Sequence, residues 1–201
     1  MDRMQREHIH AVMQLAAQGP VLLDERDVDA RDVVAARRAI DPLLQPDPVI
    51  AQSWSRCVHQ HGLDPTRMQE AIILPAQRVR EHQDRLEEFL RIARHGLEAL
   101  YQQVAGMGYC VLLTDARGVT VDFVGDLQLD TSLRRAGLVL GSDWNELHAG
   151  TCGVGTAIAT GQALVVHQGD HFDATHIPLT CTAAPVYDPL GRLNAILDVS
   201  A

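Results

Sequence analysis

The sequence predicts an α+β fold, in which a helical first half precedes an antiparallel sheet. Two observations support this prediction. Up to about Gly106 the chain is rich in Arg, Gln, Glu and Ala, which favour helices. After Gly106, short β-branched runs alternate with Gly, Asp and Pro, and short helical stretches separate pairs of strands. We therefore divide the chain into an N-terminal helical segment (1–49), a helical region (50–105) and a sheet domain (106–201).

Three short helices are predicted before residue 62. Residues 2–18 end at Gly19-Pro20, a pair that stops a helix. Residues 28–40 form a second helix, and a loop with three prolines separates it from a third helix at 50–61.

A longer helix is predicted over 76–105, because its apolar residues recur in two series that step by seven. The two series are Val79, Leu86, Ala93 and Leu100, and Leu90, Leu97 and Val104. Such a seam fits a helix that packs against its own domain. It fits equally well a helix that joins two copies into a homodimer or transmits a signal, since the seam is short and Gly96 interrupts it.

The second half shows the two-residue period of half-buried strands together with Gly- and Pro-containing turns. Strands are predicted at 109–114, 119–124, 163–166, 180–187 and 192–199, and short helices at 127–136 and 150–160. Thr151 is a suitable N-cap for the second of these helices, and Gly161 is a suitable C-cap.

Composition excludes several classes of protein. The formal net charge of −9 over 201 residues lacks the positive surface that holds a phosphate backbone, so this fragment is not expected to bind DNA directly. No apolar run approaches the roughly 20 residues that span a bilayer, and the polar start, residues 1–10, is no signal peptide. Four widely spaced cysteines without a CxxC pair predict reduced thiols and a cytoplasmic protein.

No motif predicts an enzyme, a metal site or a cofactor. The phosphate-loop pattern is absent, and the segment before Gly150–Gly155 does not read as the strand that a dinucleotide fingerprint requires. Four histidines cluster late, but their spacing matches no known ligand motif. Cys152 with a histidine base is conceivable as a nucleophile, but a buried, inert cysteine is commoner.

Several separate motifs in the second half carry a family resemblance. They are Trp144-Asn-Glu146, Gly150-Thr-Cys-Gly-Val-Gly155-Thr-Ala157, Gly169-Asp-His171, Cys181-Thr-Ala-Ala-Pro185 and Leu197-Asp-Val-Ser200. In this order and spacing they resemble the GAF domain of the acetoin-catabolism regulators, which are sigma-54-dependent transcription activators. The stretch Ile50-Ala-Gln-Ser53-Trp54 is similar to that family's N-terminal signature, so the resemblance covers about residues 50–201.

The resemblance implies a GAF-like six-stranded antiparallel sheet, flanked by helices, with a pocket for a small-molecule effector such as acetoin, a diol or a short alcohol. It also implies that full-length relatives continue into an ATPase domain and a DNA-binding domain and engage sigma-54 RNA polymerase. An input domain that takes its signal from a partner protein is the alternative.

Eight residues are expected to bind the ligand, because they lie in or near these motifs or on a strand beside them. They are Phe123, Trp144, Thr151, Cys152, Thr156, His171, Cys181 and Thr182. Trp144 stands out, since a Trp in a chain with 4% aromatic residues anchors a core or lines a pocket. Which face of the sheet forms the pocket is left open by the sequence.

Overall fold

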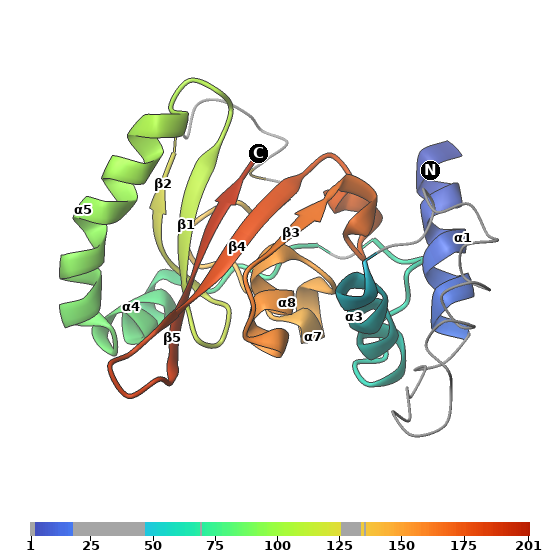
Figure 1. The fold of residues 1–201 in the computed structure, drawn as a ribbon, viewed down its shortest axis with the longest axis horizontal. Helices are drawn as coiled ribbons and strands as arrows, with labels where there is room; N and C mark the ends of the chain where they lie inside the picture. The colour runs from blue at the N-terminus through green and yellow to red at the C-terminus, as the bar shows by residue number, and fades with distance from the viewer. Residues whose placement is uncertain (1–2, 18–46, 69, 126–133, 135) are drawn as a thin grey trace, which may run out of the picture.

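The computed structural model describes residues 3–17, 47–68, 70–125, 134 and 136–201, and it confirms the predicted α+β class. A five-stranded sheet lies at the centre with helices around it (Figure 1). The strands are β1 (Cys110–Asp115), β2 (Thr120–Val124), β3 (Leu164–His167), β4 (Thr180–Tyr187) and β5 (Leu193–Ser200). The helices are α1 (Arg3–Ala17), α3 (Pro48–His59), α4 (Ala76–Asp84), α5 (Glu87–Val104), α7 (Glu146–Ala149) and α8 (Gly153–Thr160), and the 3-10 turns are η1 (Gln168–Asp170) and η2 (Ala174–His176).

The sheet has the order β2-β1-β5-β4-β3, and every neighbouring pair is antiparallel. The resemblance implied six strands, and the part of the chain that the structure describes contributes five. The predicted helices at 28–40 and 127–136 fall largely outside the described residues.

The predicted helix over 76–105 is two helices, because the chain turns at Arg85 and Leu86 between α4 and α5. Polar contacts hold α4 at the edge of the sheet: Nδ1 of His82 lies 2.6 Å from Oδ2 of Asp115, and the Gln83 amide donates to the Val121 carbonyl at 2.8 Å. The turn then lets α5 lie along the sheet (Figure 1).

The apolar seam of α5 packs on its own sheet. Leu97 is buried against Val111, Leu113, Val121 and Ala195. The other seam residues that join this cluster are Leu86, Leu90, Ala93, Leu100 and Val104. The packing interpretation of the seam is therefore correct for these residues, and the homodimer stays a prediction.

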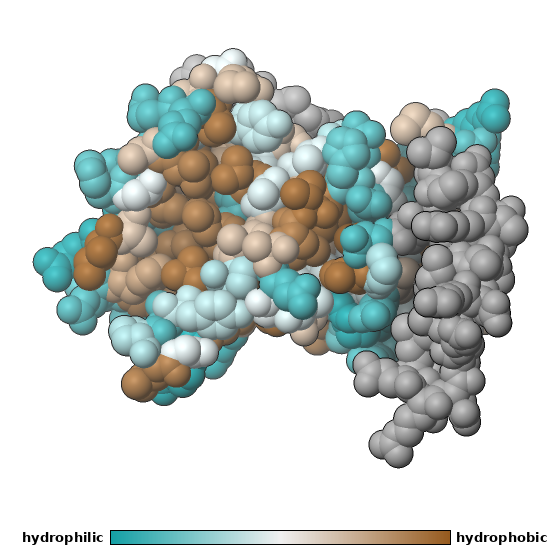
Figure 2. Space-filling model, in the orientation of Figure 1, coloured by the Kyte–Doolittle hydropathy of each residue, from teal (hydrophilic) through white to brown (hydrophobic). Residues whose placement is uncertain are grey.

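Helix α5 covers this face of the sheet at β1, β2 and β5 but not at β3. The row that crosses the strands runs through Val124, Val111, Val199, Thr182 and Val165 by strand register. Its first members join the α5 cluster, whereas Val165 is 54% exposed. Figure 2 shows apolar residues gathered over the middle of the molecule, where Figure 1 shows the strands.

The opposite face of the sheet is covered by α7 and α8. Leu112, Ile196, Cys181 and Ala183 pack there against residues of α8 such as Val154 and Ala157. Gly161 ends α8 with the left-handed φ of +66° predicted for its cap. The N-cap is Cys152 and not Thr151, because the Cys152 sulfur accepts from the Gly155 N–H while the Thr151 hydroxyl contacts Ser53 and Cys57.

The N-terminal helices dock beside β3. Val12 of α1 and Trp54 of α3 share an apolar cluster with Val166 and Phe172. The Trp54 indole donates to the Asp170 carbonyl at 2.9 Å. The division at residues 49 and 105 stays a prediction, but α1, α3 and β3 contribute to one core. No helix in the described part of the chain is long and apolar enough to cross a membrane.

Candidate functional site

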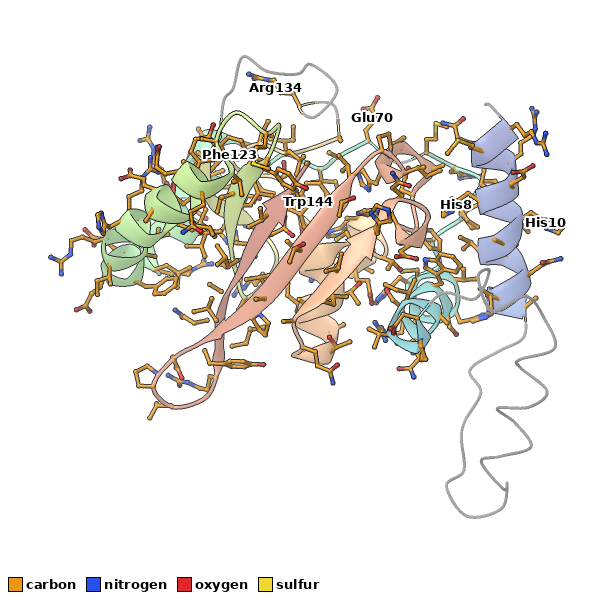
Figure 3. All side chains as sticks on the ribbon, turned by 45° about the horizontal axis from the view of Figure 1, so that its top comes forward. His8, His10, Glu70, Phe123, Arg134 and Trp144 are labelled. Carbon is orange, nitrogen blue, oxygen red and sulfur yellow. The ribbon has the colours of Figure 1, made fainter. Side chains whose placement is uncertain are left out.

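A small pocket, with room for about one water-sized molecule, lies on the side of the sheet covered by α7 and α8. Three separate stretches of chain line it: 70–72, 142–149 and 173–176. The lining residues are Glu70, Ala71, Ile72, Ser142, Asp143, Trp144, His148, Ala149, Asp173 and His176. Trp144 is buried and Glu70, labelled near the edge of the molecule in Figure 3, is exposed, so the pocket lining extends from the surface to the interior.

Backbone pairing forms one wall of the pocket. The Asp143 N–H donates to the Ile72 carbonyl, and the Leu74 N–H donates to the Gly141 carbonyl, both at 2.9 Å. Ile73 and Ser142 thus form an antiparallel bridge outside the main sheet. This pairing holds the extended segment 72–74 against the residues that precede Trp144.

Three side chains that line the pocket carry buried polar atoms with no hydrogen-bond partner. They are Oγ of Ser142, Nε1 of Trp144 and Nδ1 of His176. A buried polar group without a partner costs roughly 1–3 kcal/mol. The described residues contain five such atoms, so most of this unmet hydrogen bonding is concentrated at one pocket.

The surroundings of His176 define both its tautomer and its charge. Its Nε2 lies 3.2 Å from the Ala136 carbonyl oxygen, which can only accept, so Nε2 carries the proton in the neutral ring. Burial lowers the pKa of His176, partly offset by the Asp173 carboxylate, and keeps the ring neutral. The Trp144 and His176 ring centroids are 5.5 Å apart.

The charged groups of the pocket are mainly acidic. Asp143 accepts from the Asn145 N–H and lies 2.9 Å from Nδ1 of His148. Asp173 accepts from the N–H and the hydroxyl of Thr175, both at 2.7 Å. With Glu70, three carboxylates and no Lys or Arg line the pocket. This charge disfavours an anionic ligand.

Two of the predicted residues, His171 and Cys181, form a neutral pair that is buried in the protein interior. Nε2 of His171 lies 3.3 Å from the Cys181 sulfur, and Nδ1 lies 3.0 Å from the Gln168 carbonyl. Burial lowers the pKa of His171 to about 3 and raises the pKa of Cys181 well above its usual value. The thiol therefore donates to the imidazole, and this pair is unsuited to act as a thiolate nucleophile with a general base.

A second polar cluster joins α3 to α7 and α8. The Ser53 hydroxyl donates to Glu146, and lies 2.6 Å from the Thr151 hydroxyl. The Thr156 hydroxyl also donates to Glu146, at 3.2 Å, and Arg56 donates to both of its carboxylate oxygens. Thr151 and Thr156, predicted as ligand contacts, thus bind protein groups here.

The structure brings some of the eight predicted residues together and separates others. Trp144 lines the pocket, and Cys152 caps α8 beside it, donating to the Trp144 carbonyl at 3.4 Å. Phe123 packs against the same core cluster as Trp144. Thr182 is exposed on the opposite face of the sheet, because it follows the inward-facing Cys181 on β4.

The sequence analysis missed Ser142 and His176 as pocket residues, and Ser53 and Arg56 as partners of Glu146. The cluster of late histidines was the one local signal for His176. Among the described residues, no group of three or more His, Cys, Asp or Glu side chains is placed to hold a metal ion.

Comparison with known proteins shows that the chain is similar to part of several transcription regulators. It is 59% identical over all of its 201 residues to the acetoin catabolism regulatory protein of Cupriavidus necator, and covers 28% of that protein. It is 26% identical over 151 residues, 75% of the chain, to the acetoin dehydrogenase operon activator AcoR of Bacillus subtilis, of which it covers 25%. It is 29% identical over 162 residues, 78% of the chain, to the propane 2-monooxygenase operon activator MimR of Mycolicibacterium smegmatis, of which it covers 26%.

The chain therefore spans about a quarter of the length of these three relatives. Among solved structures, a chain in the crystal structure of the Escherichia coli DhaR(N)–DhaL complex has the same fold, with a TM-score of 0.71 and 22% sequence identity. The match covers 77% of this chain and 53% of that one. The profile described as "MimR, N-terminal domain" matches residues 28–201, and the chain belongs to that family.

Proposed function

We propose that this chain is the input region of a bacterial sigma-54-dependent transcription activator, and that a small uncharged metabolite widens and occupies the pocket beside Trp144. The observation that supports the proposal is the gathering of three unpartnered buried polar atoms, on Ser142, Trp144 and His176, around one pocket. Ligand pockets are mostly apolar with a few directed polar groups, and these three side chains supply such groups.

The class of ligand follows from the relatives and from the charge of the pocket. Two relatives are regulators of acetoin catabolism. Acetoin and the related diols carry no charge, which suits a pocket lined by three carboxylates and no Lys or Arg. A ligand of so few atoms binds with millimolar to micromolar affinity, given a ceiling of about 1.5 kcal/mol per heavy atom.

The test is calorimetric titration of the chain with acetoin and with 2,3-butanediol, repeated on Trp144→Phe. That variant keeps an aromatic ring and removes the indole N–H, so we expect about tenfold weaker binding. Thr182→Ala, on the far face of the sheet, is the control and should bind like the wild type. Absence of heat and of a thermal shift with both ligands in the folded wild type would remove the proposal.

A second candidate function is an input domain controlled by a partner protein. Two observations favour it: the structural neighbour DhaR(N) is in a complex with the protein DhaL, and the described residues leave the β3–β4 side of one sheet face uncovered. Val165 is 54% exposed there, and Thr182 is exposed beside it. Such an apolar surface is typical of protein interaction sites.

This candidate is tested by sedimentation of the chain with purified DhaL. Binding that is lost in Val165→Glu would support it, provided that the variant has the circular dichroism spectrum and melting temperature of the wild type. Sedimentation of the two proteins as separate species at high micromolar concentration would rule out a DhaL-like partner.

A further inference from the structure

The two flanks of α5 differ in charge. One flank carries Arg94, whose guanidinium pairs with Asp122 on β2 and with Glu98 one turn further along α5. Because β2 lies at one end of the described sheet, this charged flank faces the sheet edge, and the other flank faces β5 and β4. Within the described helix, this second flank carries no charged side chain. Its residues are Phe89, Ile92, Gly96, Ala99, Leu100 and Gln103.

This uncharged flank of α5 is largely open to solvent. Ile92 is 68% exposed, and a Cβ on Gly96 would meet nothing within 4 Å. Ala99 is exposed as well. Phe89 and Leu100 join the cluster between α5 and the sheet but are only half-buried. The described part of the chain therefore leaves this side of α5 without cover.

The strands next to this flank present a second uncharged surface. Cys181 and Ala183 of β4 pack toward α8, so the residues that alternate with them point to the face where α5 lies. Val165 of β3 is directly opposite Thr182 and shares its face. We define the open strand surface as Val165, Thr182, Ala184 and Val186. Figure 2 shows apolar residues gathered on this side of the molecule, over the strands that Figure 1 shows beside α5.

This face of the sheet has room for a second helix beside α5. Five strands that lie about 4.8 Å apart span roughly 20 Å. A helix with its side chains is about 10–12 Å wide, so α5 covers roughly half of this width. The uncovered half is bounded by the uncharged flank of α5 on one side and has the open strand surface beneath it.

A second copy of this chain carries a helix that fits this space. A two-fold axis parallel to α5 places the α5 of each copy over the open strand surface of the other, with the two helices side by side between the two sheets. Gly96, which has no side chain, lets the helices approach closely. Ile92 points away from its own sheet and then faces the strands of the second copy. A helix from another protein would cover the strands but leave Ile92 exposed, so a second copy fits both surfaces better.

We infer that the uncharged flank of α5 and the open strand surface together form the interface of a symmetric homodimer. The apolar seam of α5 is used within the chain, so the dimer uses other residues of the same helix. This inference goes beyond the proposed function, because binding a metabolite requires only one copy. The second candidate function assigns the same strands to another protein, so the test uses this chain alone.

Sedimentation equilibrium of the purified chain tests the interface. The wild type should be a dimer at high micromolar concentration. Ile92→Lys and Thr182→Glu should each weaken the dimer by about a hundredfold or more, because each places two unpaired charges in an apolar contact. Leu147→Lys is the control. Leu147 is 46% exposed on α7, which covers the opposite face of the sheet, so this variant should dimerise like the wild type.

Mixing the two variants tests the reciprocal arrangement. In a mixed dimer, the α5 of the Ile92→Lys copy lies on the strands of the Thr182→Glu copy, so the two introduced charges are opposite. The other half of the interface is wild type. An equimolar mixture should therefore form dimers at concentrations at which each variant alone is a monomer. A mixture that stays monomeric overturns the placement of α5 on the strands of the second copy.

Salt should strengthen the dimer. Two copies with a formal net charge of −9 each repel one another, whereas the surfaces in contact are uncharged. Raising the salt concentration from about 0.01 M to about 0.15 M shortens the Debye length from about 30 Å to about 8 Å and screens this repulsion. The dissociation constant should fall severalfold. A dissociation constant that rises with salt shows attraction between opposite charges and overturns the inference.

Three further results overturn it. They are a wild type that is monomeric at high micromolar concentration, a dimer that resists both Ile92→Lys and Thr182→Glu, and a dimer that Leu147→Lys also dissociates. Each variant must first have the circular dichroism spectrum and melting temperature of the wild type. Should Thr182→Glu not fold, Val165→Glu on the neighbouring strand replaces it. A monomeric wild type leaves both functions proposed above standing.

Discussion

Arg56 in α3 and Glu146 in α7 form an ion pair across 90 residues of sequence, with Nε of Arg56 2.8 Å from Oε2 of Glu146. The Glu146 carboxylate is nearly fully buried and also accepts from Ser53 and Thr156. The pair joins the N-terminal helices to the segment that begins at Trp144. Replacing either residue of the pair should therefore lower the free energy of unfolding.

Replacing Arg56 by Met is expected to lower the free energy of unfolding by roughly 3 kcal/mol, because it leaves a buried carboxylate without its cation. Urea denaturation followed by circular dichroism measures this loss. Arg78→Met is the matched control, since Arg78 pairs with exposed Glu81 and should change stability by less than about 1 kcal/mol. Equal effects of the two variants would show that the pair contributes no more than a surface one.

The same Gly-to-Ala change should have opposite effects in two helices. Gly96 is exposed on α5 and a Cβ there meets nothing within 4 Å, so Gly96→Ala should stabilise the chain by about 1 kcal/mol. A Cβ on Gly155 would lie 2.7 Å from the Trp144 carbonyl oxygen and 2.8 Å from the Glu146 nitrogen. Gly155→Ala should therefore destabilise by about 1–3 kcal/mol, despite the better helix propensity. Thermal melts that shift in the same direction for both variants would contradict this.

Asp198 should make stability fall as the pH rises. Burial raises its pKa to about 7, against an ordinary value of 3.8, although the Ser200 hydroxyl donates to it. Between about pH 4 and pH 7 the folded chain holds a proton that the unfolded chain has released, so the free energy of unfolding decreases through this window and levels off above it.

Asp198→Asn removes this titration, so its melting temperature relative to the wild type should rise from pH 5 to pH 8. Asp188→Asn is the control. Asp188 is half-buried, and hydrogen bonds from the Arg192 backbone lower its pKa, so its stabilisation is present above about pH 4 and is lost only below it. Parallel melting curves for wild type and Asp198→Asn across pH 5–8 would exclude a titrating Asp198.

The four cysteines should not react with a thiol reagent in the folded chain at pH 8. All four are buried, and burial raises the pKa of Cys57 and of Cys110 to about 12 and also raises the pKa values of Cys152 and Cys181 well above the ordinary value of a thiol. Since only the thiolate attacks, Ellman's reagent should release colour slowly in buffer and rapidly for four thiols in guanidinium. Rapid labelling of one thiol in buffer would reveal a reactive cysteine.

Much of the sheet could be predicted because its signals are local. The bounds predicted for β4 match the structure, since its alternation and the turn at 188–191 lie within one stretch of chain. The break between α4 and α5 could not be predicted in this way. It depends on Asp115 and Val121, which lie 33 and 38 residues after their partners in α4, while the seven-residue repeat continues across Arg85 and Leu86.

The candidate site likewise contains features that local sequence signals predict and features that depend on distant residues. Trp144 could be singled out by composition, but the partners of Thr151 and Thr156 come from α3, about 100 residues earlier. One inconsistency within the predicted set was avoidable: Cys181 and Thr182 are consecutive in a strand, so the two-residue period excludes that both face one pocket. The sequence does not reveal which of them does, because that depends on how the sheet is covered.

The pairing of segment 72–74 with 141–143 has a mechanical consequence. Only Pro75 separates Leu74 from α4, so the wall of the pocket at Ile72 and the first turn of α4 are parts of one continuous, hydrogen-bonded backbone. Any molecule that widens the pocket at Ile72 must either break the bond from the Asp143 N–H or carry the start of α4 with it. Opening the pocket therefore costs either the two backbone hydrogen bonds at its rim or a displacement of α4, the helix that precedes α5.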